Sequence, residues 1–484
     1  MFIFTFVNPS ARIIYYLQTA MPLIVRKHSV WSVLKQLKTS NMVLKHDWQI
    51  FVNWYQSKKY TKSTFNPSGF TDVLISLCQS RRFIIEDIIT QEALLNGSYS
   101  YGPLGMELKK NLITKWWDSM VLSKERVFGI ETPQHMIGSL NSEDKTMTLV
   151  ETEVLRAILR NKNLSMKETI ASLEELLKKS AILRSNLLEG AFQLYAKSLN
   201  LVNEKLPFGL AEVGVCYQPV ATEHETTSSA VRAGEVEVAS LVWFSSPRTS
   251  GQWRDYWVRQ RLLWWRKFAR HPSSFTANDF QDENGIKGTA LYFSFPWGKE
   301  PIETLLSLEE KEVVLKHLGS KSELQGRDGR KTVVPHVLSV SGNLDRGVMA
   351  YLTDSLHLSE QIDSKCSCNQ KQVLKLHPFL VPIKVALDVG RGSTGELRQV
   401  CEGLFRQMLE KRINTWPGYL ETAQVSMEQL FTKYDEMGVI FTIVINESTL
   451  ESGLVQLRNR DTTMKETMHI SEVIEFLTKY IQES

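Results

Sequence analysis

Cysteine is scarce in this sequence. The 484 residues contain five cysteines, an odd number at scattered positions, which argues against a disulfide framework. The two that lie close together, Cys366 and Cys368, form a single CxC pair in a polar stretch with no second pair nearby. A structural zinc site needs four ligands. We therefore expect no metal site, and we expect no cofactor.

Acidic residues are absent from positions 1–46. This stretch contains six basic side chains among hydroxyl and apolar residues, a composition typical of a mitochondrial transit peptide. The alternative is a secretory signal, but no continuous apolar core leads to a small-residue cleavage site. Met21 is a second candidate start, and it leaves the interpretation unchanged. We assign 1–46 to a transit peptide and flexible N-terminus.

Long apolar runs and a strong net charge are also missing. No run is long enough to span a membrane, so we expect no membrane contact. The net charge is +4, with 57 basic and 53 acidic residues, so nucleic-acid binding has to come from local basic patches. With 43% hydrophobic residues, a chain of this length predicts two or three globular domains.

The most informative stretch that is present is 206–220, LPFGLAEVGVCYQPV. Its apolar positions predict a strand of an antiparallel sheet followed by a loop. This residue pattern resembles the second signature motif of class II aminoacyl-tRNA synthetases, above all glycyl-tRNA synthetases. The resemblance implies an Arg on the ATP α-phosphate and a Glu two residues later. This chain has Gln218 and Val220 there, and Gln lacks the charged, bidentate fork of Arg.

Two further stretches resemble the same family. Tyr101-Gly102-Pro103-Leu104-Gly105 is similar to the turn that opens the long helix of the first class II motif, and the pattern of 70–117 predicts helix, turn and helix. Residues 337–347 resemble the third motif, whose Arg binds ATP. Arg346 matches that Arg, but Asn343 and Asp345 replace glycines, and a carboxylate beside a triphosphate is repulsive. The nucleotide pocket is therefore degenerate.

Residues 149–190 predict a helical hairpin inserted between the first two motifs. Ser165 and Glu168 form a capping box for its second helix, in which apolar residues recur at helical spacing as far as Leu187, and Gly190 closes it. Two helices cannot bury their apolar stripes alone. The hairpin therefore packs either on its own domain or against its copy in a second subunit.

The last part of the chain, 373–484, alternates strands and helices. Strands are predicted at 379–387, 413–416, 439–445 and 453–457, and helices near 395–411, 426–434 and 470–481. The pattern and the LRNRDT stretch at 457–462 resemble the anticodon-binding domain of class II synthetases. The predicted fold is thus α+β, with a class II synthetase-like antiparallel-sheet core at 60–372 and this α/β domain behind it. Polar residues 353–372 form a candidate linker, and Gly453 is a candidate partner-interface residue in a turn.

Two sets of basic residues are candidates for binding DNA. The first lies in a polar, Gly-rich loop predicted to be exposed, and comprises Arg327, Arg330 and Lys331. The second lies on one face of a predicted helix at 252–270, and comprises Arg259, Arg266 and Arg270. That face is either a solvated surface or a phosphate contact. The aromatic face of the same helix fits a core position better than a base-stacking platform.

Together these stretches resemble the family of vertebrate-type accessory subunits of mitochondrial DNA polymerase gamma. The resemblance implies a non-enzymatic processivity factor that forms a homodimer and binds the catalytic polymerase subunit and double-stranded DNA. It also implies a place in the mitochondrial matrix, at the nucleoid. The alternatives are an active mitochondrial glycyl-tRNA synthetase, which needs the missing Arg and Glu, and a degenerate synthetase-like protein that binds tRNA.

Overall fold

The computed structural model describes residues 67–85, 94, 99–137, 147–161, 164–218, 234–282, 285–316, 321–362, 368–390, 394–421 and 426–483. The predicted transit peptide, Val220 and Cys366 lie outside these ranges. Thr71–Ser484 form one compact unit, and all contacts below lie within it. Among the described helices, none is long and apolar enough to cross a membrane.

A seven-stranded sheet organises the core. Its order is β1-β5-β6-β12-β9-β8-β7, antiparallel except where β1 runs parallel to β5. The strands are β1 (Val127–Gly129), β5 (Phe208–Tyr217), β6 (Glu235–Ser245), β7 (Phe275–Gln281), β8 (Lys287–Phe295), β9 (Gly298–Leu308) and β12 (His336–Asn343). The predicted strand in 206–220 is β5, and the predicted antiparallel sheet is present.

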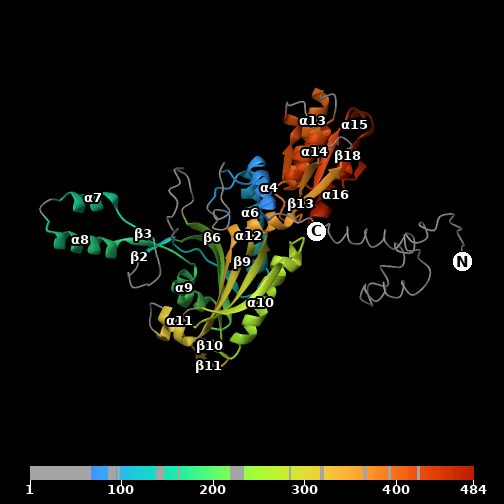
Figure 1. Ribbon diagram of the computed structural model, residues 1–484. Coiled ribbons are helices and arrows are strands. Elements are labelled where there is room, and N and C mark those ends of the chain that lie inside the picture. The colour runs from blue at the N-terminus through green and yellow to red at the C-terminus, as the bar shows by residue number, and fades with distance from the viewer. Residues whose placement is uncertain are drawn as a thin grey trace, which may run out of the picture. The chain divides into compact units, whose positions relative to one another are not determined.

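Helices cover both faces of this sheet (Figure 1). Side chains of adjacent strand residues point to opposite faces. Phe244 packs against Phe192 and Tyr195 of α9 (Leu188–Leu201), whereas its neighbour Trp243 packs against Trp257 of α10 (Ser250–Lys267). Helix α11 (Glu310–Lys316) joins the α9 side, and α12 (Leu344–Ser355) and α6 (Pro103–Trp117) lie with α10.

The YGPLG turn begins helix α6 because two glycines allow the chain to approach another segment closely. Gly102 is the N-cap and Pro103 the first helical residue. A Cβ at Gly102 would collide with the carbonyl oxygen of Arg82, and one at Gly105 with that of Phe83. These carbonyls follow the preceding helix, α4 (Pro67–Ser80). The predicted helix, turn and helix are confirmed, and α6 continues into a short π-helix at Asp118–Leu122.

The helical hairpin is shorter than the sequence predicted. It comprises α7 (Thr152–Arg160) and α8 (Met166–Lys179), and the predicted Ser165–Glu168 capping box is present. After Ser180, whose backbone is extended, the chain forms β4 (Ala181–Leu183). This strand pairs with β2 (His135–Ile137) and β3 (Met147–Leu149). The apolar residues from Ile182 onward therefore belong to a sheet and to α9, and Gly190 lies within α9 against Thr132.

Helices α7 and α8 lie side by side (Figure 1) and bury none of their residues. The interpretation that the hairpin packs on its own domain is therefore wrong. Its large exposed apolar side chains are Val154, Leu159, Met166, Ile170 and Leu177. Exposed apolar groups at helical spacing form a face that a partner surface can cover.

The C-terminal part forms a separate five-stranded sheet of order β16-β15-β17-β18-β19. Its strands are β15 (Val385–Val389), β16 (Thr415–Pro417), β17 (Phe441–Ile445), β18 (Leu454–Asn459) and β19 (Lys465–His469). Its helices are α13 (Gly395–Glu410), α14 (Met427–Glu436), α15 (Glu447–Ser452) and α16 (Ile470–Glu483). The first three strands are parallel and the last two antiparallel, which confirms the predicted mixed α/β arrangement.

Two sequence expectations on this side were incomplete. Strand β19 and helix α15 were missed, because Met468 is the one apolar residue of β19 and α15 is only six residues long. The expected polar linker at 353–372 is also wrong. Helix α12 continues to Ser355, and the strands β13 (Leu356–Ile362) and β14 (Cys368–Leu374) form an antiparallel pair.

Candidate functional site

The degenerate nucleotide site lies where β12 runs into α12. Asn343 ends the strand and caps the helix, because its side chain accepts a hydrogen bond from the backbone N–H of Arg346 at 2.9 Å. Asp345 has no solvent exposure. Its carboxylate accepts hydrogen bonds from the Tyr101 hydroxyl at 2.8 Å and from the Glu237 backbone N–H at 2.9 Å. The third-motif residues Asn343, Asp345 and Arg346 are thus brought together.

A lysine from α6 completes this network. Lys109 Nζ lies 3.1 Å from the Asp345 carboxylate and also pairs with Glu237. Burial, with the charge of Asp345, raises the pKa of Tyr101 well above its usual value, so the phenol remains a donor. The cation is held between two carboxylates. A triphosphate at this place would meet two carboxylates, and the positive charge of Lys109 is already paired with them.

The other predicted nucleotide residues are dispersed. Strand pairing places Asn343 of β12 beside Val238 of β6, whose other neighbour is Gly214 of β5, whereas Gln218 lies at the exposed end of β5, beyond Tyr217. Arg346 is half-buried and donates to the Pro301 carbonyl at 2.9 Å. Burial lowers the pKa of its guanidinium. The family's phosphate-binding arginine therefore has a structural contact here.

Two buried ion pairs on the sheet were missed by sequence reasoning. Arg184, directly after β4, donates to Glu212 at 2.8 Å, to Val215 O at 2.8 Å and to Thr132 O at 2.9 Å. Arg261 of α10 donates to Glu303 at 2.8 Å. The available signal was an acid within an otherwise apolar strand, as at Glu212 in FGLAEVGV, because such an acid has to be buried with a cation.

The first DNA-binding candidate is a β-hairpin rather than the predicted loop. Strand β10 (Gly326–Asp328) turns at Gly329, which has φ +63°, into β11 (Lys331–Val333). Side chains of Arg327, Arg330 and Lys331 are exposed, as expected. Arg327 forms an ion pair with Glu204 at 2.8 Å, so among the three it offers the least free charge.

The second candidate set is divided by the structure. Arg259 is exposed on α10 and Arg270 is exposed beyond its end. Arg266 is half-buried, and its guanidinium donates to the Phe275 carbonyl at 2.7 and 3.1 Å, which supports β7. Trp257 and Trp264 are buried, in agreement with the core interpretation of the aromatic face.

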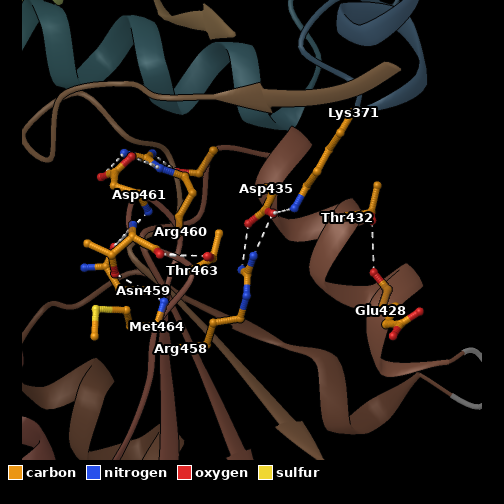
Figure 2. Close-up of polar contacts among 12 residues, drawn as sticks. Lys371, Glu428, Thr432, Asp435, Arg458, Asn459, Arg460, Asp461, Thr463 and Met464 are labelled. Carbon is orange, nitrogen blue, oxygen red and sulfur yellow. Dashed lines mark hydrogen bonds and ion pairs between the residues drawn. The ribbon is translucent and has the colours of Figure 1, made fainter. Parts of the chain in front are cut away.

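The LRNRDT stretch of the C-terminal domain serves structure (Figure 2). Arg458 of β18 binds Asp435 of α14 with two hydrogen bonds, at 2.7 and 2.9 Å, and Lys371 of β14 binds the same carboxylate at 3.0 Å. Arg460 donates to the carbonyls of Gly438 and Leu376. These contacts join the C-terminal domain to the strand pair that precedes it.

Comparison with known proteins decides between the alternatives. DNA polymerase subunit gamma-2 of Bos taurus is 53% identical over 414 residues, which cover 85% of this chain and 85% of the relative. The Mus musculus protein of the same name is 53% identical over 85% of this chain and 90% of its own length. DNA polymerase subunit gamma-2, mitochondrial, of Xenopus laevis is 48% identical over 85% of this chain and 87% of its own length.

The chain belongs to the DNA polymerase subunit gamma-2 family. This membership confirms the resemblance drawn from the motifs, in which the chain is a non-catalytic accessory subunit of the mitochondrial DNA polymerase. The synthetase relation is distant: a glycine–tRNA ligase of Treponema denticola is 23% identical over 83% of this chain and 95% of its own length.

Two further likenesses concern the fold of this gamma-2 family member. The anticodon binding domain family matches residues 380–480. The structure of Giardia lamblia prolyl-tRNA synthetase in complex with prolyl-adenylate superposes with a TM-score of 0.57 at 11% identity, over 86% of this chain and 80% of that one. The class II synthetase-like fold is thus confirmed.

Gly453, the candidate interface residue, ends α15 in the left-handed conformation, with φ +69°. A Cβ there would lie 2.5 Å from Nε2 of His469, at the end of β19. Its carbonyl accepts a hydrogen bond from Ile470, the first residue of α16. Gly453 therefore sets how α16 begins, and it presents no side chain to a partner.

Proposed function

We propose that this chain acts as a homodimer that holds the catalytic subunit of mitochondrial DNA polymerase gamma on double-stranded DNA. The observation that carries the proposal is the closed network around Asp345. A synthetase fold whose nucleotide site is filled by its own carboxylates and lysine acts through its surfaces. The proposal places the protein in the mitochondrial matrix, at the nucleoid.

Each surface has a distinct part in this proposal. The hairpin within 149–190 provides the contact between the two copies, because a two-fold axis lets two identical apolar faces cover each other. The domain at 373–484 docks the catalytic subunit, by analogy with its recognition role in synthetases. The β10–β11 hairpin contacts DNA phosphates through Arg330 and Lys331.

The test is primer extension by the catalytic subunit on a long single-primed template, with and without this chain. We expect longer products per binding event, and the increase should persist at salt concentrations where the catalytic subunit alone dissociates. A protein that binds tRNA tightly but leaves product length unchanged would contradict the proposal and favour the tRNA-binding alternative.

A further inference from the structure

A second group of basic side chains gathers at the C-terminal end of α12, where α10, β13 and β14 meet. It comprises Arg270, His271, His357 and Lys375, here called the junction cluster. Arg270 and His271 follow α10, His357 lies on β13 beside Val373, and the backbone N–H of Lys375 donates to Ser355 O at 2.8 Å. Segments distant in sequence thus contribute four basic groups to one place.

Asp354, a carboxylate in contact with the cluster, is already satisfied. Asp354 is buried and accepts hydrogen bonds from the backbone N–H of Arg270 at 2.5 Å and of His271 at 3.1 Å. Nδ1 of His271 lies 3.0 Å from the same carboxylate. Arg270 is therefore anchored by its main chain, and the residue is exposed.

The remaining charges lack an acidic partner. Within the part of the chain that the structure describes, Arg270 and Lys375 form no ion pair. The pKa of His357 is lowered, first by burial and then by the charges of Arg270, Lys375 and His271, which favours the neutral imidazole. The C-terminal dipole of α12 favours cations nearby but uses none of their side-chain donors. A cluster of this kind is suited to an anion with several oxygens.

The junction cluster continues a line of positive charge along α10. Arg259 is exposed on that helix, and Arg270 is exposed in the segment that follows the helix end at Lys267. The exposed acid Asp255 lies one turn before Arg259, so the line begins at Arg259.

We propose that the junction cluster is a second phosphate-contact site for duplex DNA, reached along α10 from Arg259. The inference rests on the proposed DNA-binding function and adds a location for it. Phosphate contacts fix the position of a duplex without reading its sequence. The site is therefore independent of base sequence and sensitive to salt.

The test uses the full chain with Arg270→Gln and Lys375→Gln together, and labelled duplex DNA titrated at several salt concentrations. Both residues hold the fold through backbone N–H groups, which glutamine retains. We expect the slope of log K against log salt to become shallower by about 1.8, since each lost phosphate contact removes about 0.9. The matched control is Lys287→Gln with Lys299→Gln, which removes two exposed charges at the ends of β8 and β9.

The conservative variant Arg270→Lys should keep the wild-type slope, because the charge remains. A double variant with the slope of the control pair would overturn the inference while leaving DNA binding by the β10–β11 hairpin intact. Wild-type protein without salt-dependent binding would overturn both proposals. A double variant that loses only the catalytic subunit would instead identify the cluster as a contact for an acidic protein surface, and would also overturn the inference.

Discussion

The β12–α12 connection and the α7–α8 hairpin differ in the exposure of their unusual side chains. The connection buries a carboxylate, whereas the hairpin exposes apolar groups. At the β12–α12 connection, Asp345 is fully buried and each of its carboxylate oxygens has a hydrogen-bond donor, so the site is closed to a nucleotide. On the hairpin, Leu159 and Met166 are 63% and 77% exposed. The protein keeps the synthetase fold, but its own side chains occupy the nucleotide site. Exposed apolar side chains lie on the α7–α8 hairpin.

The largest expected effect comes from removing the hairpin helices. Replacing Thr152–Lys179 by a short Gly-Ser linker leaves β3 and β4 paired, so the rest of the fold should survive. We expect light scattering at micromolar concentration to give half the mass of the intact protein. Lys179→Ala, which breaks only an exposed i,i+4 pair on α8, is the control and should remain dimeric. A dimeric deletion variant would locate the interface elsewhere, for instance at α6.

The next effect compares a buried ion pair with an exposed one. Arg184→Met leaves the Glu212 carboxylate buried without its cation, and the free energy of unfolding should fall by about 3–5 kcal/mol. Arg327→Met breaks the pair with Glu204 at the surface and should cost about 0–1 kcal/mol. Urea denaturation of both variants measures the difference. Equal losses in the free energy of unfolding would show that the Arg184–Glu212 pair is not what joins the β2-β4-β3 sheet to the seven-stranded sheet.

A smaller effect is expected at Gly453. Gly453→Glu forces a side chain into a left-handed backbone conformation and against His469, at a cost of roughly 1–2 kcal/mol. Because α16 begins at this turn, we expect about tenfold weaker association with the catalytic subunit. Gly395→Glu adds the same charge at the start of α13, where no atom lies within 4 Å of the new Cβ. If the two variants bind the catalytic subunit equally well, α16 is not part of the dock.

The smallest effect concerns the β10–β11 hairpin. Arg330→Ala with Lys331→Ala should make the salt dependence of DNA binding shallower by about 1.8, with little change in stability. Adding Arg327→Ala should change the slope less than either of the others, because Glu204 already neutralises that guanidinium. Titration of duplex DNA at several salt concentrations measures these slopes. An unchanged slope in the double variant would move the interface to α10.

Strongly periodic segments were predicted well because local pattern and tertiary environment agree in them. Strand β5, helix α10 and most of the C-terminal elements follow directly from apolar spacing. The second hairpin helix was predicted too long because Ile182 and Leu183 fit a helical stripe. Their pairing with Met136 and Met147, a contact between distant residues, makes them a strand instead.

The candidate site was only partly predictable for the same reason. Substitutions at Asn343 and Asp345 showed that the nucleotide pocket was degenerate. Spacing alone gives no sign that Lys109 and Tyr101 of the first motif fill it, because those residues lie more than two hundred positions away. Likewise, the basic face of α10 predicted Arg266 as a phosphate contact, whereas the structure directs its guanidinium to a backbone carbonyl.

The most direct test of the central claim is glycine-dependent exchange of pyrophosphate into ATP by the purified full chain. The reaction requires a site that holds a triphosphate, and here Lys109 is paired with Asp345 and Glu237. We predict no exchange above the level without protein, at any glycine concentration. Robust glycine-dependent exchange would show that the pocket still binds and activates its substrates, and would contradict the account of a synthetase fold that acts through its surfaces.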